Sequence, residues 1–189
     1  MPLDLSATSN GPLDRLGVPS HGAELTAQPP VARFVLRGRP GAVEAAADTF
    51  GTPLPQQACR AVTVAGGRAA LWLGPDEWLL LAPVAEGPAL ATALERAMDG
   101  HPHSLVDVSH RQAGIEVSGP DAAATLNAGC PLDLDADAFP PGMCTRTVLA
   151  KAEIVLWRTA PETFRVEAWR SFAAYVWSFL EEASREFRA

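Results

Sequence analysis

The sequence from residue 31 onward contains one succession of segments twice, and this repeat restricts the possible folds more than any other feature. With a shift of 85 positions and no gap, the aligned pairs include Cys59 with Cys144, Val64 with Leu149, Leu71-Trp72 with Leu156-Trp157, and Glu77 with Glu162. Nearer the start of each repeat the shift is 81, which aligns Gly38 with Gly119. We therefore expect two α+β units related by a pseudo-two-fold axis that carries Leu71-Trp72 onto Leu156-Trp157. Any ligand or partner surface is expected near the contact between the units.

The first unit, residues 31–110, is predicted to run strand, helix, hairpin, strand, helix. Alternating apolar residues over 31–36 predict a half-buried strand. The Ala-rich stretch that follows predicts a helix over 41–50, which Gly51 ends. Gly66-Gly67 lies between two apolar runs and suits the tight turn of a β-hairpin, because glycine tolerates a positive φ. A strand, an amphipathic helix and a linking strand complete this unit.

The second unit, residues 111–189, repeats the same order, with a hairpin over 146–158 and a last strand over 163–169. Ser171 is the expected N-cap of a long final helix. The apolar face predicted for this helix consists of Phe172, Tyr175, Val176, Phe179, Leu180, Ala183 and Phe187. The fold class that follows is α+β, with mostly antiparallel sheets covered by helices on one face.

Residues 1–30 differ from the two units, because they are rich in Pro, Gly, Ser, Thr and Asn and show no steady period. Such composition predicts an extended arm that is disordered or lies along a neighbouring protein. Its large apolar side chains suit small pockets on a partner surface, and those selected as interface candidates are Leu3, Leu5, Leu13 and Leu16.

Composition excludes several kinds of partner. The chain of 189 residues has a net charge of −7, whereas duplex nucleic acid and anionic membranes require clustered basic residues. No apolar run approaches the ~20 residues of a membrane span, and the first residues lack the pattern of a signal peptide. The three cysteines, Cys59, Cys130 and Cys144, show no paired spacing, which suits reduced thiols and a cytoplasmic location.

No motif in the sequence predicts a catalytic, cofactor-binding or metal-binding residue. Neither a dinucleotide-binding glycine fingerprint nor a P-loop is present. His101, His103 and Asp107 alternate as metal ligands on a strand would, but no second cluster completes a site. Ser109 and His110 are adjacent, so their side chains point apart on an extended chain, and no nucleophile elbow surrounds the serine.

Tryptophan and arginine are the residues left to consider. We expect about three of the five tryptophans to fill the two cores, which leaves one or two for a partner surface. Trp169-Arg170, at the end of the last predicted strand, is the preferred interface pair, because both residue types are enriched among interface hot spots. Arg111 and Arg146 are open to a second interpretation, in which they form internal salt bridges.

Six longer segments resemble the gamma subunit of heterotetrameric sarcosine oxidase. The similarity runs from about Phe34 to Leu180 and says less about the arm. More remotely, the chain is similar to the duplicated front part of aminomethyltransferases and YgfZ-like folate-binding proteins, in agreement with the repeat. The six segments are 71–79 (LWLGPDEWL), 106–112 (VDVSHRQ), 127–133 (NAGCPLD), 139–146 (FPPGMCTR), 149–153 (LAKAE) and 169–172 (WRSF).

This resemblance implies a role in a larger enzyme. Members of that family assemble with alpha, beta and delta subunits. The assembly demethylates sarcosine to glycine, forms hydrogen peroxide and transfers the one-carbon unit to tetrahydrofolate. FAD, FMN and NAD are expected on the two larger subunits and zinc on the smallest, so the gamma chain carries no catalytic motif to transfer. The implied function is a non-catalytic structural subunit with a large hetero-interface.

Two other classes of function remain open. A free-standing folate-binding or aminomethyltransferase-like protein is one, although the chain lacks the length for the extra C-terminal domain of those families. A small regulatory binding module unrelated to oxidation is the other. Tetrahydrofolate titration distinguishes the first alternative, and co-purification of bound chains distinguishes the second.

Overall fold

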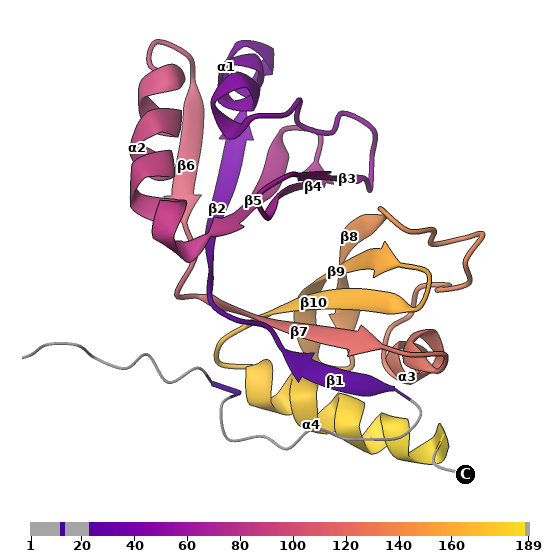
Figure 1. Cartoon of the computed structure of the whole chain (residues 1–189). Helices are drawn as coiled ribbons and strands as arrows, with labels where there is room; N and C mark the ends of the chain where they lie inside the picture. The colour runs from indigo at the N-terminus through magenta and orange to yellow at the C-terminus, as the bar shows by residue number, and fades with distance from the viewer. Residues whose placement is uncertain (1–11, 14–22, 188–189) are drawn as a thin grey trace, which may run out of the picture.

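Two five-stranded antiparallel sheets form the centre of the molecule, and each carries helices on its outer face (Figure 1). The computed structural model describes residues 12–13 and 23–187. The first unit comprises β2 (Val31–Gly38), α1 (Pro40–Phe50), β3 (Ala61–Val64), β4 (Arg68–Gly74), β5 (Glu77–Pro83), η1 (Val84–Glu86), α2 (Gly87–Ala97) and β6 (His103–Asp107). The second comprises β7 (Gln112–Ser118), α3 (Ala122–Asn127), β8 (Cys144–Leu149), β9 (Ala152–Ala160), β10 (Thr163–Trp169), α4 (Ala173–Ser184) and η2 (Arg185–Phe187).

Strand order confirms the internal duplication. The first sheet has the order β3-β4-β5-β2-β6, and the second has the order β8-β9-β10-β7-β1. Each strand of one sheet therefore has a counterpart at the same place in the other, and all strand pairs are antiparallel. Leu71-Trp72 on β4 and Leu156-Trp157 on β9 occupy equivalent strands, as the repeat predicts.

One strand crosses between the units. Strand β1 (Glu24–Ala27) precedes the first unit in the sequence but pairs with β7 at the edge of the second sheet. It takes the place that β6 takes in the first sheet, and Figure 1 shows it above α4. The expected arm over residues 1–30 missed this strand, because four residues with a single buried apolar side chain, Leu25, give no usable period.

The ungapped repeat alignment pairs residues of β4 and β9 that lie on opposite faces of their sheets. Leu71 lies opposite Leu79 and packs between the sheets, whereas Leu156 lies opposite Val166 and packs against the helices of its own unit. The structural counterpart of Leu71 is Trp157, one residue further along. A slip of one residue reverses every side chain of a strand. The slip arises because the hairpin β8–β9 pairs six residues per strand and β3–β4 pairs four.

Three clusters of buried side chains stabilise this arrangement. One lies between the first sheet and α1 and α2, and another lies between the second sheet and α3 and α4. The third joins the inner faces of the two sheets, where each large side chain removed from water contributes roughly 1.5–3 kcal/mol. Its buried members are Ala69, Leu71, Leu79, Leu81, Val108, Cys144, Val155 and Trp157.

Helix α4 differs from its prediction in its start and in its buried face. It begins at Ala173 after Phe172, and no side chain caps it, so the Ser171 N-cap is wrong. Trp177 is buried in the core of the second unit, whereas Phe172 and Tyr175 are 43% and 39% exposed. Of the other tryptophans, Trp78 and Trp157 are buried, in line with the expectation of about three in the cores.

A buried ion pair joins the two sheets beside the third cluster. Arg33 on β2 donates from Nε to Glu167 Oε2 on β10 at 2.7 Å, and both side chains are at most 2% exposed. Arg165 also donates to Glu167, at 2.8 Å. The backbone of Arg33 binds the connection between the units, because its N–H donates to Ser109 Oγ at 2.9 Å and its carbonyl accepts from Val108 N–H at 2.8 Å.

Removing the charge of Glu167 is expected to destabilise the chain strongly. Glu167→Gln leaves the guanidiniums of Arg33 and Arg165 buried without a carboxylate, and breaking such a pair costs about 3–5 kcal/mol. The free energy of unfolding of the purified chain in denaturant measures this loss. The matched control is Glu162→Gln, an exposed carboxylate in the β9–β10 turn, with an expected effect within about 0.5 kcal/mol. Equal effects of the two substitutions would contradict a structural role for the ion pair.

Candidate functional site

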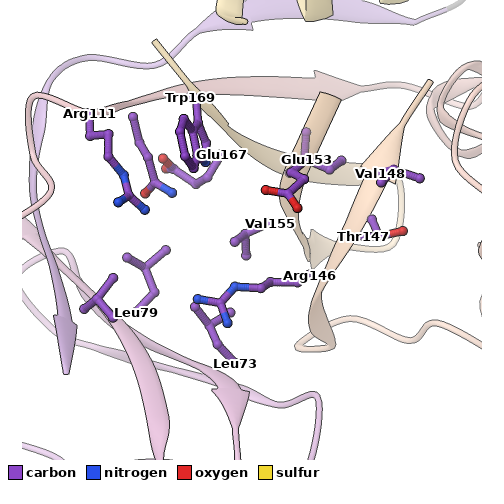
Figure 2. Close-up of a pocket in the computed structure, with 13 residues that line it drawn as sticks. Leu73, Leu79, Arg111, Arg146, Thr147, Val148, Glu153, Val155, Glu167 and Trp169 are labelled. Carbon is purple, nitrogen blue, oxygen red and sulfur yellow. The ribbon is translucent and has the colours of Figure 1, made fainter. Parts of the chain in front are cut away.

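A cavity of about 530 Å³ lies between the inner faces of the two sheets (Figure 2). Pockets of roughly 300–1,000 Å³ are the usual size for ligand sites in proteins. The cavity is therefore at the contact between the units, where the repeat predicted a functional surface. The first sheet contributes Val35, Leu73 and Leu79, and the remaining lining residues are Arg111, Gln112, Arg146, Thr147, Val148, Glu153, Ile154, Val155, Glu167 and Trp169.

Arg111 and Trp169 stand at one side of this cavity (Figure 2). Strand pairing places them together, because Gln112 lies opposite Trp169 and Arg170 N–H donates to the Arg111 carbonyl at 2.7 Å. The Arg111 guanidinium carbon lies 4.7 Å from the centre of the Trp169 ring, which is a cation–π geometry. Trp169 nevertheless remains 41% exposed, so its ring is available to a partner.

A second hollow begins at the same two residues. It measures about 620 Å³ and is lined by Pro12, Arg111, Trp169, Arg170 and Ser171. It lies along the connection between β10 and α4, outside the cavity between the sheets. Arg111 and Trp169 line both hollows, so the two hollows adjoin at these residues at the rim of the cavity, and together they are called the depression below.

Arg146 belongs to a second ion-pair cluster between the units. Its guanidinium donates to Glu77 on β5, and Arg37 donates to the other oxygen of the same carboxylate at 2.8 Å. The hydrogen bond from Arg146 is the largest cause of a lowered pKa at Glu77. Glu77 is only 5% exposed, so this carboxylate is held charged between two guanidiniums.

The two buried carboxylates between the units, Glu77 and Glu167, are both engaged in ion pairs. Glu77 has a lowered pKa, and a general base at neutral pH needs a pKa near that pH. Glu167 accepts hydrogen bonds from Arg33 and Arg165, so its carboxylate, like that of Glu77, is bound by two guanidiniums. Two buried carboxylates are thus each paired with two guanidiniums, and the accessible side chains of the lining include the cationic Arg111, the aromatic Trp169 and the acidic Glu153.

The other residues that the sequence analysis considered for catalysis or metal binding make contacts within the fold. Ser109 Oγ accepts a hydrogen bond from Arg33 N–H, so it helps to hold the connection between the units. Burial raises the pKa of the Cys144 thiol to about 12, which keeps this thiol protonated. His103 Nε2 lies 2.9 Å from Glu95 Oε2.

Within residues 12–13 and 23–187, no group of three or more His, Cys, Asp and Glu side chains could hold a metal ion. No helix over this range is long and apolar enough to cross a membrane.

The predicted interface residues separate into three groups. Trp169 and Arg170 lie at the rim of the cavity, where the aromatic ring is exposed. Leu13 is 5% exposed and packs in the core of the second unit, so its side chain is not available to a partner and that expectation needs correction. Leu3, Leu5 and Leu16 lie outside the described residues.

Sequence reasoning missed the ion-pair clusters. It left Arg111 and Arg146 open between a partner surface and internal salt bridges, and the structure shows Arg146 paired with Glu77 across the units. Glu77 and Glu167 were not identified at all. The available signal was a pair of opposite charges on one face of a strand, since Arg165 and Glu167 alternate with the apolar residues of β10. A buried charged residue needs a partner.

Acid is expected to weaken the contact between the units through Glu77. Its folded pKa is lowered, so its contribution to stability is complete above the unfolded pKa of about 4.3 and disappears as pH falls through the lower folded value. The free energy of unfolding should therefore fall below about pH 4. Glu77→Gln should be less stable at neutral pH and should show a smaller acid-induced loss. Unfolding curves at several pH values measure both effects, and an unchanged pH profile would show that Glu77 is not coupled to Arg146.

Comparison with known proteins identifies the family. The model of the family "Sarcosine oxidase, gamma subunit family" matches residues 38–186. A sarcosine oxidase subunit gamma from Arthrobacter sp. is 38% identical over 154 residues, which cover 80% of this chain and 75% of that protein. Another, from Corynebacterium sp. (strain P-1), is 37% identical over 147 residues, which cover 78% of this chain and 71% of the relative.

Comparison with solved structures supports the same family and shows the fold that it shares with other proteins. A chain of the heterotetrameric sarcosine oxidase from Corynebacterium sp. U-96 is 30% identical with a TM-score of 0.87, and the match covers 95% of this chain and 96% of that one. The glycine cleavage system aminomethyltransferase T from Bartonella henselae has the same fold at 15% identity, with a TM-score of 0.68 over 87% of this chain and 47% of its own. The duplicated α+β fold, its two sheets and the sequence similarity all lead to one assignment: the chain belongs to the sarcosine oxidase gamma subunit family.

Proposed function

We propose that this chain is a structural subunit of a cytoplasmic heterotetrameric sarcosine oxidase and that it carries no catalytic centre of its own. In this proposal it assembles with alpha, beta and delta subunits. The partners carry FAD, FMN, NAD and zinc, oxidise sarcosine to glycine with formation of hydrogen peroxide, and pass the one-carbon unit to tetrahydrofolate. The gamma chain contributes surfaces that hold the assembly together.

The observation that supports this proposal is the match along nearly the whole chain to one chain of a heterotetrameric sarcosine oxidase. That match has a TM-score of 0.87 and covers 95% of this chain and 96% of the other. The site described above agrees with a binding role, because its buried carboxylates are held in ion pairs.

The interface is proposed to include Trp169 and Arg170. Trp169 is a large, rigid side chain that is 41% exposed, and exposed aromatic residues next to arginine are typical of interface hot spots. Phe172, which precedes α4, and Tyr175, on its first turn, are also exposed aromatic side chains. A subunit of this kind should bury well above ~1,000 Å² against its partners.

Affinity capture tests the proposed function. The tagged chain, expressed in the organism that encodes it, should retain the other oxidase subunits, and the eluate should show a flavin absorption spectrum. The isolated chain should bind neither flavin nor nicotinamide, should retain no zinc after dialysis and should not oxidise sarcosine. Capture of no flavoprotein chain, or a flavin spectrum from the chain purified alone, would contradict the proposal.

Titration with tetrahydrofolate provides the comparison with a free-standing folate-binding protein. A structural subunit should show no saturable binding when isolated, whereas a folate-binding protein should bind with a defined stoichiometry. Calorimetry on the chain alone and on the reconstituted complex separates an intrinsic folate site from one that belongs to a partner subunit.

A further inference from the structure

The depression that crosses the rim of the cavity has an unusual charge for this chain. Arg111 makes no ion pair with a carboxylate in the described part of the chain, and its described side-chain contact is the Trp169 ring. The chain as a whole has a net charge of −7. The Arg111 guanidinium at the rim of the cavity therefore provides a local positive charge on a chain that is acidic overall.

Neighbouring acidic groups do not compensate Arg111. Glu167 also lines the cavity, but Arg33 and Arg165 already pair with it. Glu77 is likewise shared between Arg37 and Arg146. Each of these two carboxylates is bound by two guanidiniums, so neither is available to Arg111. Glu153, the remaining acidic residue of the lining, is exposed.

The shape of the depression favours an elongated ligand. One end lies between the sheets, and the other runs along the surface past Arg170 and Ser171, with Arg111 and Trp169 in the middle. Figure 2 shows Arg111 and Trp169 at one side of the cavity and Arg146 at another. An extended polypeptide segment that follows this path would bring its side chains to the cation, the ring and the cavity in turn.

We propose that this depression binds an extended segment of a partner subunit that carries aspartate or glutamate, with a carboxylate on Arg111 and an adjacent side chain on Trp169. The inference rests on the proposed function, because the partner is a subunit of the same oxidase. Arg111 is preorganised by Trp169, so a carboxylate gains a charge-assisted, bidentate hydrogen bond without the cost of ordering the guanidinium. An acidic segment also complements the charge of Arg111, for which the described residues supply no carboxylate.

Charge reversal at Arg111 tests the proposal in the assembled enzyme. Arg111→Glu should weaken association with the other subunits by about tenfold or more and should reduce its salt dependence. Trp169→Ala should weaken association by about fivefold or more. The matched control is Arg185→Glu, which makes the same charge change at an exposed arginine paired only with Glu182 among the described residues. Its affinity should remain within about twofold of the original.

Thermal unfolding of the isolated variants separates binding from folding. Arg111→Lys retains the positive charge but loses the bidentate, stacked geometry, so it should assemble less tightly than the original chain and more tightly than Arg111→Glu. A variant with an unchanged melting temperature and weakened assembly supports the proposal. Normal assembly of both Arg111→Glu and Trp169→Ala would overturn it, while capture of the flavoprotein chains by the original protein would leave the proposed function intact.

Carbodiimide cross-linking identifies the segment directly, because this reagent joins an amine to a carboxylate in contact. The chain contains one lysine, Lys151, so Arg111→Lys introduces a second lysine amine at the rim. In the assembled enzyme, position 111 should become linked to an aspartate or glutamate of a partner subunit, which mass spectrometry would locate. A complex that forms but gives links from Lys151 alone, or links from position 111 only to this chain, would show that no acidic segment lies at Arg111.

Discussion

The ion pair between Arg33 and Glu167 is the contact on which the arrangement of the two units depends. Its partners are 134 positions apart in the sequence, one on each sheet, and both are almost fully buried. The Arg33 backbone also binds Val108 and Ser109, in the connection between the units. One residue therefore sets the position of the neighbouring sheet and of the chain that leads to it. Loss of this charge pair would affect the apolar contact between the sheets as well, because both lie in the same layer.

The segments that carry the family resemblance meet at this layer. Glu77 in the segment 71–79 pairs with Arg146 in the segment 139–146. In the same way, Arg111 in 106–112 stacks on Trp169 in 169–172. The structure explains these residues as parts of the contact between the units and of its rim.

Local sequence patterns predicted the bounds of helices and strands well. They predicted less well which face of an element is buried. Gly51 ends α1 with a φ of 92°, as a glycine at that position predicts, and β10 has the bounds expected from the sequence. Helix α4 is different, because aromatic residues occur on several of its sides. A 3.6-residue period cannot choose among Phe172, Tyr175 and Trp177. The choice was made by packing against the second sheet, which buries Trp177 and leaves the other two exposed.

By itself, the sequence determined the duplication, the α+β class and the order of elements in each unit, because all three are encoded in local periods and turns. Tertiary structure alone decided which face of each strand is buried between the sheets, since that face changes with a slip of one residue at the hairpin. It also decided that β1 completes the second sheet. The same holds for the partners of the buried charges: a lone arginine or glutamate specifies that it needs an opposite charge, but only the folded chain brings Arg33 to Glu167 and Arg146 to Glu77.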